Sequence, residues 1–253
     1  MRVEWHCFVR ASGPTVTPPD DPRALTMPKL SVIVPALNEA DVIGPTLVAL
    51  ASIRGRGHEV LVVDGGSHDA TPDAAGEFAD QVLIAPEGRA RQMNAGAAAA
   101  TGDVLWFVHA DTQPPADADE RISFAVRSGA LWGRFDVQLA GRQRSLRLVE
   151  RMINLRSRIT GIATGDQAVF VRRDVFAQLG GFPDIALMED IALSRNLKRV
   201  ARPCCLRQTV VTSSRRWESH GILRTVVLMW RLRLAYALGA DPAVLARRYR
   251  ASD

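Results

Sequence analysis

The 253-residue sequence predicts one α/β domain, with a mostly parallel, twisted sheet flanked by helices and followed by a helical carboxyl-terminal segment. Short runs rich in β-branched residues alternate with longer amphipathic segments, which is the pattern of successive βαβ units. The apolar runs 31–34 and 60–63 stop abruptly at polar residues, as buried parallel strands do where they meet a loop. A composition of 47% hydrophobic and 23% charged residues supplies enough apolar material for a core.

The first half of the chain alternates strands and helices in a regular order. Strands are predicted at about residues 30–37, 59–64, 81–85 and 104–108. Helices are predicted between them at 39–52, 71–79 and 90–100, and Pro72 suits the first turn of the second helix. Right-handed crossovers would join these strands into a parallel sheet and bring their carboxyl ends to one edge.

The alternation becomes less regular after residue 111. A helix near 117–127 is predicted to precede a strand at 133–139, a basic amphipathic helix near 142–158 and an extended segment at 168–172. The last third is predicted to be mainly helical, at about 187–199, 222–238 and 242–250. In the basic helix, five apolar residues are expected to face one way: Leu146, Val149, Met152, Ile153 and Leu155.

Three stretches of the chain are expected to differ in character. Residues 1–27 are predicted to be a disordered extension, because residues 11–28 are rich in Pro, Thr and Asp. Residues 28–217 are expected to form the sheet domain, and residues 218–253 a helical segment packed on it. There is no run of about 18 apolar residues and no signal-peptide core, so no membrane-spanning helix is expected.

Charge is distributed unevenly along the chain. Residues 1–140 carry 11 Lys and Arg against 18 Asp and Glu, whereas residues 141–250 carry 21 against 8. Basic surface favours polyanions, but no zinc-finger spacing or RNA-binding aromatic motif occurs, so nucleic acid is not expected as a partner. Cys7, Cys204 and Cys205 form no disulfide framework or metal spacing, which suits a reducing cytoplasm.

Polar residues gather where the predicted strands end, the edge at which open α/β sheets bind ligands. Asn38 and Glu39 follow the first strand, Asp64 ends the second, and Asp69 lies shortly after it. Two glycines follow Asp64, and glycine lets a ligand approach the backbone closely, so Asp64 is a candidate nucleoside contact. An Asx turn or a helix cap is the alternative interpretation, above all for Asp69.

A third acidic loop, His109-Ala110-Asp111, follows the apolar run 104–108. Alternate residues of an extended backbone point the same way, so His109 and Asp111 are predicted to converge on one divalent cation, Mg²⁺ or Mn²⁺. Such an ion neutralises a diphosphate leaving group. The alternative is that Asp111 only begins a turn before Pro114-Pro115.

Two adjacent acids, Glu189 and Asp190, open the predicted helix at 187–199. Negative charge at a helix amino terminus is favourable in itself, which accounts for Glu189 without any function. An acid in a water-poor cleft also acts as a general base. Both interpretations stay open at this point.

Two basic runs complete the candidate residues. Arg89 lies near a predicted helix amino terminus, where it opposes the dipole unless an anion is present, so Arg89, Gln92 and Asn94 are candidate phosphate or ribose contacts. Arg216 is a candidate diphosphate ligand and Trp217 a candidate sugar-stacking residue. Simple surface exposure and a basic loop are the alternatives.

Taken in this order, the residues resemble the family-2 glycosyltransferases of the GT-A fold, over about residues 30–217. The runs 88–94 and 214–217 resemble a compact bacterial subgroup, part of which is associated with arsenosugar biosynthesis. The resemblance is carried by Pro35-x-x-Asn38-Glu39, Val63-Asp64-Gly65-Gly66-Ser67-x-Asp69-x-Thr71, the strand ending in Asp111, Gly165-Asp166-Gln167, Gly180-Gly181-Phe182 and Glu189-Asp190.

This resemblance implies a GT-A-like single domain that transfers a sugar, with inversion, from a nucleotide-diphosphate donor to an acceptor hydroxyl. A divalent cation, Mg²⁺ or Mn²⁺, would assist, and the acceptor would be a small molecule or a lipid. With the candidates above, the site residues are catalytic Asp190 and Glu189; donor-binding Pro35, Asn38, Glu39, Asp64, Asp69, Arg89, Gln92, Asn94 and Arg216; acceptor-side Gly165, Asp166, Gln167 and Trp217; and metal-binding Asp111 and His109.

Two positions depart from the family pattern. His109 stands where the metal motif often has a first acid, which leaves the choice between Mg²⁺ and Mn²⁺ open. Ser213 stands where processive relatives have glutamine in Gln-x-x-Arg-Trp, so we expect transfer of a single sugar.

Other function classes are a nucleotidyltransferase and a non-catalytic nucleotide-sugar binder. The first is disfavoured because residues 36–40 contain no glycine for a phosphate loop, and the second because it needs no acid pair. The expected location is the cytoplasm. Peripheral membrane contact by the helices near 142–158 and 222–238 is an alternative to ordinary packing, although Arg224 and Arg233 fall on opposite faces of the latter.

Overall fold

The structure, a computed structural model, describes residues 27–251. The predicted disorder of residues 1–27 and the position of Cys7 therefore fall outside the described residues, apart from Met27 itself. The described chain forms an eight-stranded sheet in the order β3-β2-β1-β4-β7-β6-β8-β5. The pairings β1–β2, β1–β4, β2–β3 and β6–β8 are parallel, whereas β4–β7, β6–β7 and β5–β8 are antiparallel. The predicted α/β class with a mostly parallel sheet is confirmed.

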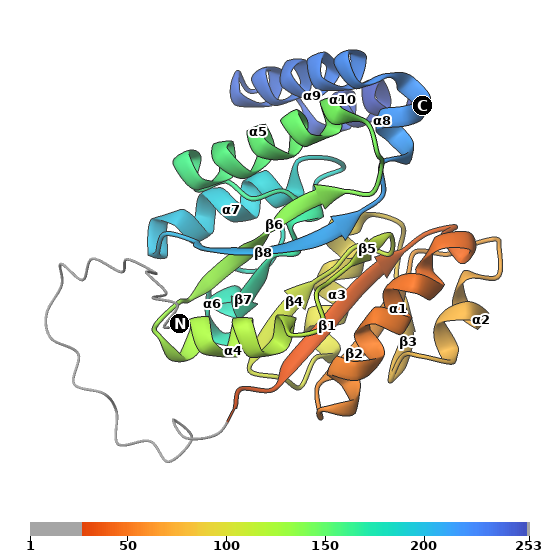
Figure 1. Cartoon of the computed structure of the whole chain (residues 1–253), viewed down its shortest axis with the longest axis vertical. Coiled ribbons are helices and arrows are strands. Elements are labelled where there is room, and N and C mark those ends of the chain that lie inside the picture. Colours follow the sequence, from red (N-terminus) through yellow and green to blue (C-terminus); the bar gives the residue numbers. More distant parts are fainter. Residues whose placement is uncertain (1–26, 252–253) are drawn as a thin grey trace, which may run out of the picture.

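The first half follows the predicted order closely (Figure 1). Strands β1, β2 and β4 are apolar runs buried between two helical layers, whereas the edge strand β3 is partly exposed. The sequence pattern and the structure agree within a few residues. The elements are β1 (Leu30–Ala36), α1 (Ala40–Gly55), β2 (Glu59–Asp64), α2 (Thr71–Gly76), β3 (Gln81–Ile84), α3 (Arg89–Ala99) and β4 (Val104–Phe107).

The second half contains a strand that the sequence analysis did not predict, β8 (Cys204–Thr212), which pairs with β6 and β5. The short elements β5, α6 and α8 were also not predicted, and α8 crosses the domain boundary expected after residue 217. The elements are β5 (Thr112–Gln113), α4 (Ala118–Arg127), β6 (Trp132–Leu139), α5 (Arg144–Thr160), the 3₁₀ turn η2 (Gly165–Gln167), β7 (Phe170–Arg172), α6 (Arg173–Gln178), α7 (Glu189–Val200), β8, α8 (Arg215–His220), α9 (Ile222–Ala237) and α10 (Pro242–Arg250).

The core lies on both faces of the sheet, because alternate residues of each strand point to opposite sides. Val32 and Val34 of β1 pack with α1, α2 and α4 on one face. Ile33 of the same strand packs with α3, α6 and α7 on the other face. The sheet is thus held rigidly, and the loops at its carboxyl edge are fixed in place.

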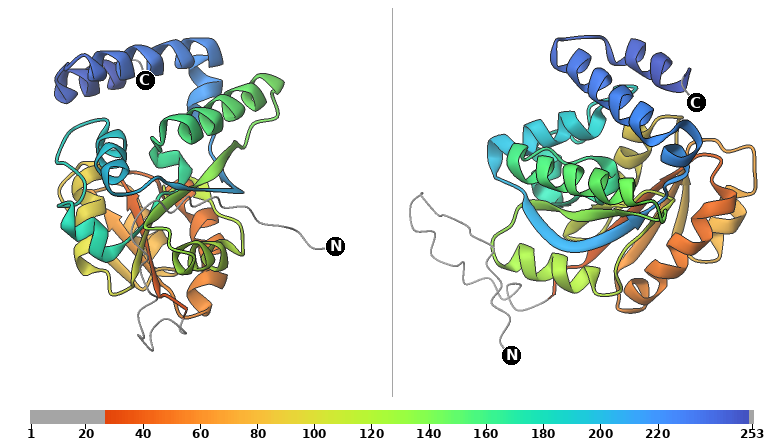
Figure 2. Two further views of the ribbon diagram at one scale, coloured as in Figure 1. Left: turned by 90° about the vertical axis from the view of Figure 1, so that its left-hand side faces the viewer. Right: turned by 45° about the horizontal axis from the view of Figure 1, so that its top comes forward.

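The helices α5, α9 and α10 gather at one end of the molecule (Figures 1 and 2). Leu146 and Val149 of α5 pack near Val226 of α9, so these helices are joined to each other. The predicted common face of α5 is wrong for Leu155, which is 59% exposed. None of the helices within residues 27–251 is long and apolar enough to cross a membrane.

Candidate active site

A cavity of about 870 Å³ lies beyond the carboxyl ends of β1 and β4, and α5, α9 and α10 supply its opposite wall. Residues from distant parts of the chain line it together, which is the arrangement expected at the carboxyl edge of an α/β sheet. Its charged lining includes Arg89, Asp111, Arg156, Asp166, Asp190 and Arg233.

The acid pair opens α7 and faces this cavity. Met188, just before it, has the left-handed φ of +73°, which turns the chain sharply into the helix. The Asp190 carboxylate accepts hydrogen bonds from the main-chain N–H groups of Gly165 (2.9 Å) and Ile191 (2.6 Å). Burial nevertheless raises the pKa of Asp190 above its usual value. Burial, followed by the charge of Asp190, raises the pKa of Glu189 to about 7.

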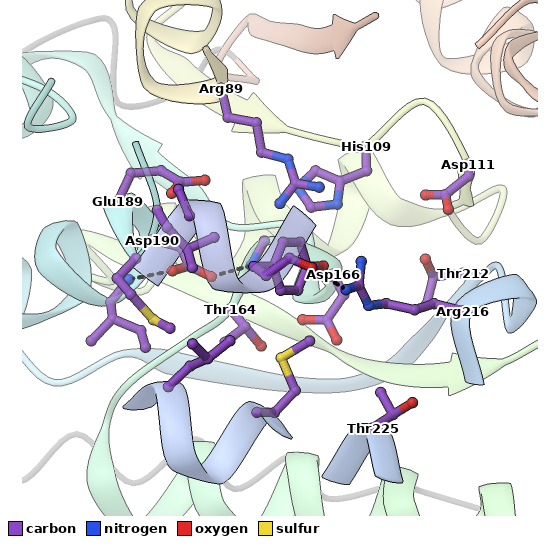
Figure 3. A pocket seen from close by; sticks show the side chains of 18 of the residues that line it. Arg89, His109, Asp111, Thr164, Asp166, Glu189, Asp190, Thr212, Arg216 and Thr225 are labelled. Carbon is purple, nitrogen blue, oxygen red and sulfur yellow. Dashed lines mark hydrogen bonds between the residues drawn. The ribbon is translucent and has the colours of Figure 1, made fainter. Parts of the chain in front are cut away.

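Arg89 is the first residue of α3, and it faces the acids across the cavity. Figure 3 shows Arg89 and His109 between the Glu189–Asp190 pair and Asp111. Burial lowers the pKa of Arg89, but neighbouring groups, above all Glu189, outweigh this and raise it. Within residues 27–251 no salt bridge joins Arg89 to any of these acids, so its charge is available to an anion in the cavity.

His109 and Asp111 both line the cavity, but the backbone between them is not extended as predicted. β4 ends at Phe107, and a turn follows in which Thr112 N–H donates to the His109 carbonyl (3.0 Å). The Nε2 edge of His109 is covered by Gly165, where a Cβ atom would come within 2.4 Å. Burial, together with Arg89, lowers the pKa of His109 to about 3, so the ring is neutral.

Carboxylates near Asp111 offer a partial fit to a divalent cation. Among the described residues, no group of three His, Cys, Asp or Glu side chains is placed to hold a metal alone. Burial is the main cause that raises the pKa of Asp111, and the nearby charge of Asp166 adds to it. The Oδ1 of Asp166 is buried without a hydrogen-bond partner among residues 27–251. Arg215 and Arg89 compensate part of the charge on Asp111, and the two carboxylates together fit a hard cation that takes its other ligands from a diphosphate and water.

The side chains of Asn38, Asp64 and Asp69 hold together the loops that follow β1 and β2. Asn38, with φ at +53°, accepts a hydrogen bond from the His68 N–H (2.9 Å). Asp64 is 2% exposed and accepts from the N–H groups of Gly66 and Ser67, both at 2.9 Å. Asp69 accepts from the Ala40 and Thr71 N–H groups at 3.1 and 3.0 Å. None of the three lines the cavity, whereas Pro35 and Glu39 do.

Gln92 and Asn94 also make main-chain hydrogen bonds. The Gln92 amide donates to the carbonyls of Ala36 (2.7 Å) and Val63 (2.9 Å), and so joins the ends of β1 and β2 beside the cavity. The Asn94 amide donates to the Phe182 carbonyl and accepts from the Phe182 N–H, at 2.8 and 2.9 Å. Asn94 does not line the cavity.

The basic segment at the start of α8 closes one side of the cavity. Arg215 pairs with Glu39 at 3.1 Å, while burial is the main cause that raises the Glu39 pKa. Arg216 lies over the ring of Tyr249 in α10, 3.6 Å from its centroid. Trp217 lines the cavity and packs against the cluster formed by α5 and α9.

The predicted acceptor-side segment, residues 165–167, has two roles. Gly165 and Asp166 line the cavity. Gln167 is fully buried and donates to Ser157 Oγ at 3.1 Å, so its side chain holds η2 against α5 instead.

Three cavity arginines were not predicted: Arg156 of α5, Arg233 of α9 and Arg250 of α10. A signal for Arg156 was present, since it lies seven positions after Val149 and three after Ile153, on their side of the helix. Arg233 likewise lies one turn after Met229. A basic residue on the inward face of an amphipathic helix marks a buried charge.

Comparison with known proteins identifies the family. The family description "Glycosyl transferase family 2" matches residues 31–176, more than half of the chain. The chain therefore belongs to glycosyl transferase family 2.

Curated relatives of this family 2 chain include the "Probable glycosyltransferase YdaM" of Bacillus subtilis. It is 29% identical over 249 residues, which cover 87% of this chain and 57% of that protein. The "Glycosyltransferase AglE" of Haloferax volcanii is 30% identical over 175 residues, covering 63% of this chain and 57% of that protein. The chain thus spans little more than half the length of these two relatives.

Solved structures confirm the GT-A-like fold. Staphylococcus aureus TarS 1–349 in complex with UDP-GlcNAc has a TM-score of 0.60 at 21% identity, covering 73% of this chain and 58% of that one. The mannosyltransferase PcManGT from Pyrobaculum calidifontis, in complex with GDP-Man and Mn²⁺, has a TM-score of 0.59 at 23% identity. It covers 91% of this chain and 66% of that chain.

Proposed function

We propose that this protein is an inverting glycosyltransferase that moves a sugar from a nucleotide-diphosphate donor to an acceptor hydroxyl. The observation that carries this proposal is the single cavity in which Asp190 lies on one side and Asp111 on the other, with Arg89 between them. A base on one side and a diphosphate site on the other suit direct displacement at the anomeric carbon. Membership of the family supports it.

The donor belongs at the end of the cavity formed by Pro35, Glu39 and Arg89. Asn38, Asp64 and Asp69 shape the loops that receive the nucleoside, through their main-chain hydrogen bonds. Arg89 would bind a diphosphate oxygen, since its charge is not paired within the described residues. Asp111, with Asp166 beside it, would hold Mg²⁺ or Mn²⁺, and the bound ion would neutralise charge on the departing diphosphate.

Asp190 is assigned as the general base. The N–H groups of Gly165 and Ile191 fix its carboxylate and leave lone pairs on both oxygens for an acceptor hydroxyl. The raised pKa of Asp190, caused by burial, strengthens it as a base for the acceptor hydroxyl proton. Glu189 lies beside it and takes part in the same titration.

Several finer assignments remain part of this proposal. The titles of the similar structures name a UDP-sugar in one case and a GDP-sugar in the other, so both donor bases belong in the test. The association with arsenosugar biosynthesis, the transfer of a single sugar and the cytoplasmic location are carried over from the resemblance and the sequence.

The test is a thermal-shift panel of UDP- and GDP-sugars with Mn²⁺ or Mg²⁺. A donor that binds the folded protein raises its melting temperature. We expect Asp111→Ala to reduce the metal-dependent rise in melting temperature. Donor affinity in the presence of metal should be about tenfold or more weaker, because the variant lacks the charged ligand of the ion. Unchanged metal-assisted affinity in this variant would reject the cation assignment.

The products distinguish the other function classes. A glycosyltransferase releases a nucleoside diphosphate, whereas a nucleotidyltransferase releases pyrophosphate and a binding protein releases neither. Detection of pyrophosphate would contradict the proposed reaction. Donor binding without turnover of any acceptor tested would contradict it as well.

A further inference from the structure

The end of the cavity remote from β1 holds two arginines from different helices. Arg156 comes from α5 and Arg233 from α9, and both line the cavity. Both lie near Asp190. Burial raises the pKa of Asp190 and the charge of Arg233 partly offsets this, while burial lowers the pKa of Arg156 and the charge of Asp190 partly offsets that. Two positive groups therefore flank the assigned base on the acceptor side.

Neither arginine is held in an ion pair within the described residues, although the charges of Asp166 and Asp190 lie near Arg156. Arg156 has one long hydrogen bond, from Nη2 to Thr164 Oγ1 at 3.4 Å, and its buried Nε has no hydrogen-bond partner. Burial, and then the like charge of Arg233, lowers the pKa of Arg156 to about 10, so the pair repel each other. An anion between them would relieve that repulsion and satisfy the Nε.

The wall next to these arginines is apolar. Met152 of α5 and Trp230 and Leu234 of α9 line the cavity and yet are 41%, 64% and 62% exposed. Large apolar side chains that are exposed at the rim of a cavity mark a ligand-binding groove. The acceptor end thus combines a positive site with an apolar surface at its entrance.

We propose that the acceptor is an alcohol that carries a phosphate group, and that Arg156 and Arg233 bind this phosphate beside Asp190. This inference rests on the proposed function. Two guanidinium groups match phosphate oxygens in bidentate geometry, whereas a neutral sugar or alcohol would leave both charges unpaired. The carbon skeleton of the acceptor would then pack on Met152, Trp230 and Leu234.

The reaction leaves this phosphate unchanged. The acceptor hydroxyl oxygen forms a bond to the anomeric carbon, its proton passes to Asp190, and the bond from that carbon to the diphosphate oxygen breaks with its electron pair. Arg89 and Asp111 act on the donor diphosphate. The acceptor phosphate only positions the hydroxyl.

The acceptor phosphate has two chemical sources, a soluble phosphate ester or a lipid headgroup, and four probes separate them. Glycerol 3-phosphate is compared with glycerol, and lysophosphatidic acid with monoacylglycerol. Each is titrated calorimetrically into the full chain, with and without saturating UDP or GDP and Mn²⁺, so that binding at the donor diphosphate site is blocked. We expect at least one phosphorylated probe to bind in the presence of the nucleotide, and its neutral counterpart to bind at least tenfold more weakly.

The variants Arg156→Gln and Arg233→Gln should each weaken that binding about tenfold or more, since each removes a charge-assisted hydrogen bond. Arg151→Gln and Arg224→Gln are matched controls, because they change exposed arginines of the same two helices outside the cavity. Arg156→Lys keeps the charge and should retain more affinity than Arg156→Gln. Nucleotide affinity should be the same in all five variants.

Equal binding of the phosphorylated and neutral probes, equal losses in the control variants, or binding that the nucleotide abolishes would overturn the inference. Binding of lysophosphatidic acid alone would identify a lipid acceptor, and binding of glycerol 3-phosphate a soluble one. Failure of the unaltered protein to bind UDP or GDP would instead count against the proposed function, whatever the probes do.

Discussion

The loops behind the sheet end of the cavity and the helices at its other end use polar side chains in opposite ways. Asn38, Asp64 and Asp69 lie outside the cavity and accept main-chain hydrogen bonds that hold those loops. At the helical end, Arg156 and Arg233 line the cavity and form no salt bridge within the described residues. Groups that the fold satisfies shape the site, whereas groups that it leaves unsatisfied are those with capacity for a ligand.

The largest effect is expected for Asp190→Asn. The variant keeps the size of the side chain but removes the base, so transfer should fall about 10²–10⁴-fold while nucleotide binding stays nearly unchanged. Single-turnover assays and nucleotide titration measure the two. The new amide N–H faces one of the two main-chain donors, Gly165 or Ile191, so a cost of about 1–3 kcal/mol of unfolding free energy is also expected. Asp184→Asn, at a carboxylate that is 62% exposed, is the control and should retain full activity. Normal turnover by Asp190→Asn would remove Asp190 from the base role.

Glu189 should make stability depend on pH. Its pKa is about 7 in the folded state against 4.5 in the unfolded chain, so between these values only the folded state retains the proton. Stability of the unaltered protein should therefore fall as pH rises from 4.5 to 7, by at most about 1.4 kcal/mol per pH unit, and level off above 7. Urea unfolding at several pH values should show that Glu189→Gln lacks this decline.

The exposed Glu77→Gln serves as the control for that series, and it should keep the pH dependence of the unaltered protein. Parallel curves for Glu189→Gln and the unaltered protein would show that Glu189 titrates normally in the folded state.

Asp64→Asn tests the loop behind the sheet end of the cavity. The amide oxygen can still accept from the Gly66 and Ser67 N–H groups, but the amide N–H then replaces the oxygen that accepts from the Ser67 hydroxyl, and the negative charge is lost. This should cost about 1–3 kcal/mol of unfolding free energy. Asp73→Asn, at an exposed position of the following helix, should cost less than about 0.5 kcal/mol. If Asp64→Asn were as stable as the unaltered protein, the loop would not depend on this carboxylate.

A steric test is Gly165→Ala, where the new Cβ would lie 2.4 Å from His109 Nε2. Relief of this overlap should cost about 1–3 kcal/mol in thermal unfolding. The double variant Gly165→Ala/His109→Ala should lose less stability than the sum of the two single variants, because the smaller residue makes room. Strict additivity would show that the two side chains do not meet.

The sequence predicted strands best where both faces of the strand are buried. Strands β1, β2 and β4 were predicted because each is an unbroken apolar run between two layers of helices. Strand β8 was not, because Arg207 and Gln208 interrupt it and much of it is only half buried. Its Thr-Val-Val-Thr end carried a strand signal that the surrounding basic helices obscured.

The same limit applies to the site. Sequence patterns indicated Asp111 and Asp190, which line one cavity, but they did not reveal that Asp64 is enclosed by its own turn. That distinction depends on which main-chain donors point at a carboxylate, and these are fixed only by the folded loop. Arg156 and Arg233 were missed because helices remote in sequence meet there only through tertiary packing.

The three-residue strand β7 has a consequence for how the chain folds. It lies between β4 and β6, and so it alone connects the amino-terminal strands to the later ones within the sheet order. Strand β4 is distant from β7 in sequence, and β6 is separated from it by α5. Pairings of this kind form slowly, because a long segment of chain must close into a loop first. The pairing of β7 with both neighbours is thus what makes the amino-terminal strands and the later strands one continuous sheet.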